Sequence, residues 1–156
     1  INVFYDASKI QDWGSVNNWI RLKMDGNTTN HRLVVHANIQ EDFSKLSQEE
    51  LAMAPKANFD GSQFNFGTIK EGDVVEHTFT LTNSGEKDLI IRKVTASCGC
   101  TAVKPEKNLI KKGESTKVGV KFNSRGKRGN QNKAVTVITN DPKNTKQILW
   151  VKGTVE

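Results

Sequence analysis

The chain of 156 residues is long enough for one well-packed domain and part of a second. Hydrophobic residues make up 35% of it, the mean hydropathy is −0.57, and no apolar run approaches the roughly 20 residues of a membrane-spanning helix. The net charge of +6 is uneven, since residues 1–58 carry −1 and residues 59–156 carry +7. Composition thus excludes a membrane-spanning helix from this chain and assigns the basic character to its second part.

The first 40 residues predict three strands. Residues 1–6 have strand-like composition and are followed by a polar connection over residues 6–15. Residues 18–24 and 33–39 form the other two strands, with a turn signal at residues 25–27 between them. Three strands make too little sheet for an independent domain.

Residues 41–58 are predicted to be a linker with a short helix. Ser47 and Glu50 fit a capping box, in which the Ser47 hydroxyl accepts from the backbone N–H of Glu50 while the Glu50 carboxylate reaches back. Pro55 then ends the helix, because proline cannot continue the intrahelical hydrogen bonds.

Residues 59–156 predict a series of short strands without helices between them. In the most regular strand, Val75, His77, Phe79 and Leu81 alternate with polar residues, as in a strand with one buried face. The other predicted strands cover residues 64–67, 89–94, 118–122, 135–138 and 148–151. About seven strands at this spacing favour an all-β fold, an antiparallel sandwich of two sheets.

Residues 1–40 resemble the end of this second domain. With small gaps, residues 20–22 fall on residues 135–137, and residues 33–39 fall on residues 149–155. The first 40 residues are therefore predicted to be the last three strands of a preceding copy of the same domain.

A partial copy would leave an apolar face uncovered, including Ile20 and Leu33. Each fully buried side chain of this kind is worth about 1.5–3 kcal/mol, so the face is expected to be covered. The candidates are the second domain or another chain, and the open edge makes self-association an expected property.

Both cysteines lie in the stretch Ser97-Cys98-Gly99-Cys100-Thr101. In an extended segment Cys98 and Cys100 project to the same side, so three alternatives stay open: inert buried thiols, a strained and easily reduced disulfide, or a site for a soft ion such as Cu(I). Zinc is disfavoured because a closed site needs about four ligands. Lys93 and Lys104 are near enough in sequence to lower a thiol pKa.

The basic residues of the second domain form a candidate anion-binding surface, comprising Arg125, Lys127, Arg128 and Lys133. They lie beside turn glycines, where solvated lysines and arginines are common. Nucleic-acid binding is disfavoured, because no recognition helix, zinc finger or aromatic RNA-binding motif accompanies the charge.

The remaining candidates have structural interpretations. His77 is expected to be a core histidine rather than a ligand, and Trp13, Trp19 and Trp150 are expected to pack on sheets rather than to form a carbohydrate platform. No Ser/His/Asp set, phosphate loop or paired carboxylate is apparent, so the sequence predicts no enzyme.

Three stretches together resemble the bacterial DUF1573 family, a domain of unknown function common in Bacteroidetes. They are Phe64-Asn65-Phe66-Gly67, Leu81-Thr82-Asn83-Ser84-Gly85 and the cysteine stretch at residues 97–101. The resemblance covers residues 60–156. It implies an immunoglobulin-like sandwich, close to the ASH and PapD-like folds, in an exported protein of the periplasm or cell surface that is often built of tandem copies.

Two functional hypotheses follow. The first is a non-catalytic envelope module without a cofactor, which binds an unknown protein or glycan and uses its cysteines structurally. The second is a redox or copper-handling module with Cys98 and Cys100 as the reactive pair. We favour the first, because fold alone does not confer function and the thiols have an ordinary structural explanation.

Overall fold

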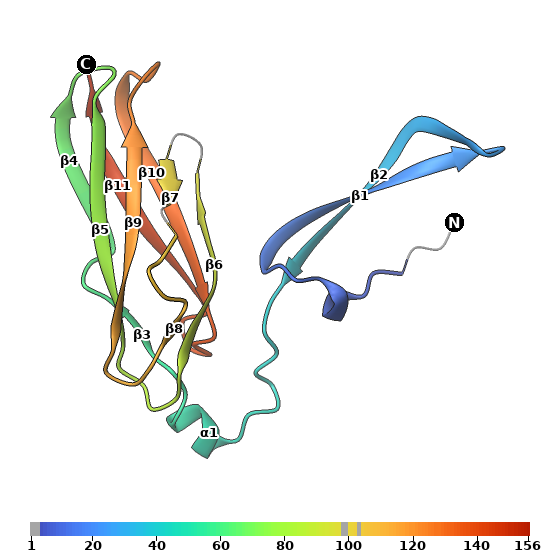
Figure 1. Cartoon of the computed structure of the whole chain (residues 1–156), viewed down its shortest axis with the longest axis horizontal. Coiled ribbons are helices and arrows are strands. Elements are labelled where there is room, and N and C mark those ends of the chain that lie inside the picture. Colours follow the sequence, from blue (N-terminus) through green and yellow to red (C-terminus); the bar gives the residue numbers. More distant parts are fainter. Residues whose placement is uncertain (1–3, 98–99, 103) are drawn as a thin grey trace. The chain divides into compact units, whose positions relative to one another are not determined.

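The computed structural model describes residues 4–97, 100–102 and 104–156. The chain forms two compact units, Ile1–Asp42 and Phe43–Glu156 (Figure 1). No helix of the described residues is long and apolar enough to cross a membrane.

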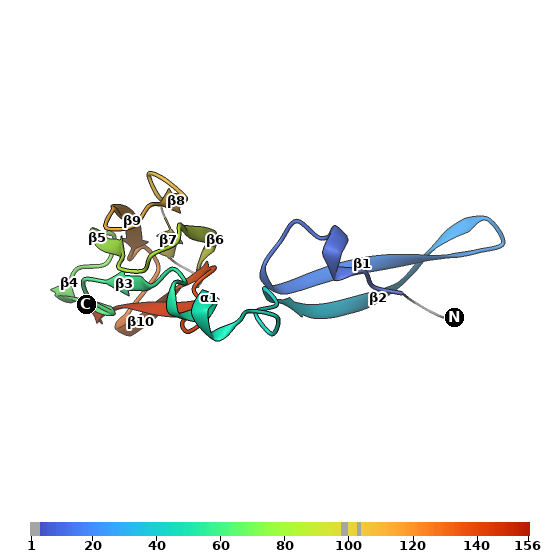
Figure 2. The ribbon, with the colours of Figure 1, turned by 90° about the horizontal axis from the view of Figure 1, so that it is seen from below.

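The second unit is a sandwich of two β-sheets. One sheet has the order β4 (Gln63–Ile69), β11 (Lys146–Val155), β10 (Gly129–Thr139), β6 (Leu89–Ala96) and β8 (Leu109–Ile110). The other has the order β3 (Ala57–Phe59), β5 (Val74–Asn83), β9 (Ser115–Asn123) and β7 (Cys100–Ala102). All neighbouring strands are antiparallel except β4 and β11, which are parallel. Figure 2 shows β5 and β9 in one layer and β10 in the other, which confirms the predicted all-β sandwich.

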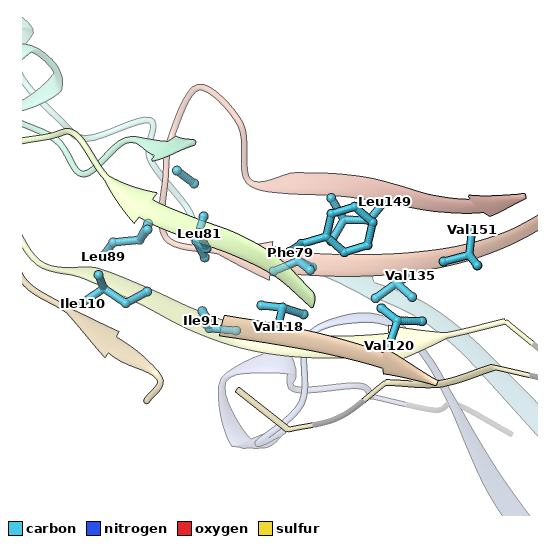
Figure 3. Packing of buried hydrophobic residues seen from close by; sticks show 12 residues of the cluster. Phe79, Leu81, Leu89, Ile91, Ile110, Val118, Val120, Val135, Leu149 and Val151 are labelled. Atoms are coloured by element: carbon cyan, nitrogen blue, oxygen red, sulfur yellow. The ribbon is translucent and has the colours of Figure 1, made fainter. Parts of the chain in front are cut away.

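The core lies between the two sheets and follows from the alternation in the sequence. On β5, Phe79 and Leu81 are almost completely buried while Glu76 and Thr78 face solvent. The buried cluster draws on both sheets, as Figure 3 shows, and comprises Ala57, Phe79, Leu81, Leu89, Ile91, Ile110, Val118, Val120, Val135, Val137, Leu149 and Val151. The period-2 pattern therefore places one face of each long strand in a shared apolar layer.

Asn83 at the end of β5 is a buried polar residue with every side-chain bond made inside the protein. Its Oδ1 accepts from the backbone N–H groups of Lys56 (3.3 Å) and Gly85 (2.9 Å). Its Nδ2 donates to the carbonyls of Lys87 and Ile110, both at 2.9 Å. This single side chain thus ties together the start of β3, the β5–β6 turn and β8.

The predicted short helix is present as α1 (Gln48–Ala52), and both halves of its capping box form. The backbone N–H of Glu50 donates to the Ser47 hydroxyl at 3.2 Å, and the N–H of Ser47 donates to the Glu50 carboxylate at 2.9 Å. The capping bond with the Ser47 backbone lowers the pKa of the Glu50 carboxyl.

Strand β3 begins inside the predicted linker of residues 41–58 and ends at Phe59, the first residue of the predicted second domain. The backbone N–H of Ala57 donates to the buried carboxylate of Asp141 at 2.9 Å, and Ala57 pairs with Asn83. Both partners are distant in sequence, so the local pattern carries no sign of this strand.

The first unit is a β-hairpin of β1 (Gly14–Met24) and β2 (Asn27–Ile39). The predicted turn is confirmed: Asp25 and Gly26 join the strands with φ values of 49° and 79°, as a tight hairpin turn of this hand requires. In Figure 2 a short blue helical turn lies beside β1.

The prediction of a strand over residues 1–6 is wrong for residues 4–6, and residues 1–3 lie outside the described part. Asp6 instead caps the short 3₁₀ helix η1 (Ala7–Lys9), because its Oδ1 accepts from the backbone N–H of Ser8 at 3.0 Å. The local cap competes successfully with strand pairing. The described part of the first unit therefore has two strands rather than the three expected for a partial copy.

Candidate functional site

The cysteine stretch lies where the chain passes from one sheet to the other. β6 belongs to the five-stranded sheet and β7 to the four-stranded sheet. The N–H of Ser97 donates to the carbonyl of Ala134 at 2.8 Å, and the N–H of Ala134 donates to the Ser97 hydroxyl at 3.0 Å. The N–H of Cys100 then donates to the carbonyl of Ser97 at 3.1 Å, which turns the chain into β7. The serine of the motif thus ends one strand and starts the crossover.

Cys100 is a half-buried free thiol that packs against the core cluster. Its Cα pairs with Phe122 of β9. Burial raises the pKa of the Cys100 thiol, and the nearby charge of Lys133 opposes this effect only in part. The thiol is therefore mostly protonated and weakly nucleophilic at neutral pH. Cys98 lies outside the described residues, so the Cys98–Cys100 disulfide and the Cu(I) site stay predictions.

The cation that acts on Cys100 is Lys133, which the sequence analysis had placed with the turn cations. The pairing of Val135 with Ala96 brings β10 alongside the end of β6 and so brings Lys133 near the crossover. Lys93 and Lys104, proposed from their closeness in sequence, do not contribute to this shift. Only the strand pairing reveals the relation, because Lys133 is far from Cys100 along the chain.

Arg125, Lys127 and Arg128 lie on the turn between β9 and β10, whereas Lys133 lies within β10. Lys133 shares the inward face of β10 with Val135 and is half-buried. Arg128 has a partner of opposite charge on the turn between β4 and β5, since its Nη2 lies 3.6 Å from Glu71 Oε2. The structure thus brings three of the four candidates together, and anion binding there stays a prediction.

His77 lies between two phenylalanines on β5 and β4. Its ring stacks on Phe64 with centroids 4.0 Å apart and meets Phe79 edge-on at 4.6 Å. These contacts engage the imidazole in aromatic packing from both neighbouring phenylalanines. Among the described residues, no three His, Cys, Asp or Glu side chains gather as a potential metal site.

A polar groove of about 460 Å³ lies across β4, β11 and β10. The side chains that define it are Asn65, Thr68, Asn130, Asn132, Lys152 and Thr154. The strand register explains the cluster, because Asn132 pairs with Lys152 and Lys152 pairs with Asn65, which places all three on one face. This site was not predicted from the sequence, although Asn130 and Asn132 alternate along one strand.

A second and smaller groove of about 260 Å³ runs beside β6. It is lined by Ile91, Arg92, Lys93, Val94, Lys104, Pro105 and Asn108. Lys93 and Lys104 therefore line a common groove.

Comparison with known proteins places the sandwich in a family. The sequence profile of a family described as "Protein of unknown function (DUF1573)" matches residues 57–155. The chain belongs to the DUF1573 family. No curated protein matches the chain.

Solved structures similar to this DUF1573 protein share its fold. A protein of unknown function from Porphyromonas gingivalis W83 superposes with a TM-score of 0.68 at 19% identity, covering 90% of this chain and 66% of the other. The ASH/PapD-like domain 7 of human CEP192 has a TM-score of 0.52 at 14% identity, covering 78% of this chain and 98% of that domain. The secreted serine protease VesC from Vibrio cholerae has a TM-score of 0.52 at 13% identity, covering 69% of this chain and 24% of the protease.

These similarities show that the DUF1573 domain shares its sandwich fold with a PapD-like domain. Because the identities are below 20%, the similarities show a shared fold and say nothing of function.

Proposed function

We propose that the DUF1573 domain of this chain is a non-catalytic binding module of an exported protein, located in the periplasm or at the cell surface. The observation that carries the proposal is the place of Cys100: it lies in a sheet crossover, packs on the core, and has its thiol pKa raised by burial. A thiol in this setting serves packing better than nucleophilic chemistry.

Other side chains that could act chemically are also engaged in structure. His77 is held between Phe64 and Phe79. The buried carboxylate of Asp141 accepts from the backbone N–H groups of Ala57 (2.9 Å) and Lys143 (2.9 Å). The exposed sheet faces and turns are left as the places where a partner protein or glycan binds. Export rests on the resemblance to envelope proteins built of tandem domains.

The test is whether the chain still binds its partner after both cysteines have been replaced by serine. The variant carrying Cys98→Ser and Cys100→Ser is compared with the unchanged chain for binding to a cell-envelope fraction of Porphyromonas gingivalis, the source of the structural relative. We expect equal affinity, because the proposal gives the two thiols a structural role and no part in binding. Loss of binding in the serine variant, with its far-UV circular dichroism unchanged, would contradict a structural role for the thiols.

The alternative function is a redox or Cu(I)-binding module. The spacing of Cys98 and Cys100 favours it, since two soft ligands one residue apart can hold one soft ion. Titration of free thiols with and without reductant and copper, followed by mass spectrometry, decides between the two functions. A labile bond between the two cysteines or a stoichiometric soft metal would make this alternative the better account.

A further inference from the structure

We propose that the polar groove across β4, β11 and β10 is a glycan-binding site with a preference for acidic sugars. This inference rests on the proposed binding function and names its ligand. The three strands lie next to one another in the five-stranded sheet (Figure 1). The groove they form measures about 460 Å³.

The groove presents hydrogen-bond donors. The Oδ1 of Asn65 accepts from the backbone N–H of Gly67 at 2.9 Å, so this amide directs its Nδ2 donors away from that bond. The Oδ1 of Asn130 accepts from the Thr154 hydroxyl at 3.0 Å, which leaves the Nδ2 of Asn130 for a ligand. Asn132 is exposed and adds a third amide. Amide donors of this kind suit the hydroxyl and carboxylate oxygens of sugars.

The groove also contains one cation, the ammonium group of Lys152. Lys152 Nζ lies 5.7 Å from the centre of the Trp150 ring and donates to Gln63 Oε1 at 3.4 Å. The ring and the amide hold the ammonium group over the same face as Asn65 and Asn132. Because the side chains lining the groove include one lysine and no carboxylate, the charge favours a ligand that carries some negative charge.

The lining also argues against the other classes of macromolecule. It contains no apolar or aromatic side chain, whereas protein partners are anchored by buried aromatic and aliphatic residues. It carries one cation, whereas nucleic acids bind through several cations together with aromatic stacking. A chain of sugars with occasional carboxylates matches amides, hydroxyls and a single ammonium group best.

The first experiment measures binding of the full chain to immobilised polygalacturonate and to uncharged dextran. We expect retention on polygalacturonate and weaker retention on dextran. The variant Asn132→Ala with Lys152→Ala is expected to lose about tenfold or more in affinity. Lys117→Ala, which removes one exposed lysine from β9 of the other sheet, is the matched control and is expected to bind as the unchanged chain does.

Several outcomes would overturn the inference. They are absence of binding to both polysaccharides, equal binding to dextran, and an equal loss in the Lys117→Ala control, which would indicate net charge alone. A second experiment, binding of the full chain to a cell-envelope fraction, distinguishes failure of the glycan inference from failure of the proposed binding function. Loss of envelope binding after periodate treatment supports the glycan ligand. If only protease treatment abolishes binding, the glycan inference is wrong and the proposed binding function stands. If the chain binds neither untreated nor treated envelopes, the proposed binding function itself is contradicted.

Discussion

At the residue scale, Gly85 lies where the backbone leaves no room for a side chain. A Cβ on Gly85 would meet the carbonyl of Ala54 and lie 2.6 Å from the backbone N of Lys56. Gly85→Ala is therefore expected to lower the free energy of unfolding by about 1–3 kcal/mol, because backbone would have to shift. Denaturant unfolding measures this. Gly61→Ala is the control, since nothing lies within 4 Å of its Cβ position, and an equal loss there would contradict the clash.

Asn83 offers a second residue-scale prediction. Replacing it with alanine leaves two backbone N–H groups and two carbonyls without their partners inside the sandwich. We expect a loss of about 3 kcal/mol in unfolding free energy, since a buried unpaired group costs about 1–3 kcal/mol and two of the four bonds, those with Gly85 and Ile110, are buried. Asn144→Ala removes an exposed amide and should change the unfolding free energy by less than about 0.5 kcal/mol. Equal unfolding midpoints for both variants would refute the role of Asn83.

The raised pKa of Cys100 gives a prediction with a definite sign. The folded protein holds the thiol proton more tightly than the unfolded chain does. The corresponding stability is therefore complete below the unfolded pKa and decreases as the pH rises through the folded pKa. In a Cys98→Ser background, alkylation of Cys100 should reach half its maximal rate at a higher pH than in the denatured chain. Adding Lys133→Ala should raise that pH further, because the opposing charge is gone. A midpoint below that of the denatured chain would contradict the burial argument.

At the element scale, the hairpin β1–β2 differs from the strands it resembles. In the sandwich, β10 and β11 are flanked by β6 and β4, whereas the first unit consists of two strands among the described residues. Leu33 and Trp19 are 40% and 55% exposed. A two-stranded hairpin with such side chains is marginal on its own in water. That the second domain or another chain covers the apolar face of this hairpin stays a prediction.

Self-association tests this expectation. Sedimentation of the full chain should show concentration-dependent association, weakened by Ile20→Lys together with Leu33→Lys, which pair across the hairpin. Thr28→Lys, near the turn, is the matched control. A monomer at all concentrations, with rapid amide exchange in both strands, would show that the face is uncovered.

Elements that depend on neighbouring residues were predicted correctly from the sequence. The capping box of Ser47 and Glu50, the turn at Asp25 and Gly26 and the alternation along β5 depend on neighbouring residues, and all three are present. The sequence did not predict β3 or the polar groove, because each depends on partners distant along the chain. The strand predicted at residues 4–6 is absent because Asp6 caps the short helix η1 instead. The composition of these residues does not show that the cap is preferred over strand pairing.

At the scale of the whole molecule, we propose that packing is the role of the crossover and that binding takes place on the outer face of the five-stranded sheet. The motif around Cys100 connects the two sheets, and the polar groove lies on strands of one sheet. The resemblance to the DUF1573 family rests partly on the stretch that holds the two cysteines. The structure directs attention to the groove, whose residues are brought together by strand register.

The most direct measurement compares two double variants of the full chain for binding to the same envelope fraction. One carries Cys98→Ser and Cys100→Ser, and the other carries Asn132→Ala and Lys152→Ala. The account predicts that the serine variant binds as the unchanged chain does, while the alanine variant loses most of its affinity. The reverse result, with binding lost in the serine variant and kept in the alanine variant, would contradict it.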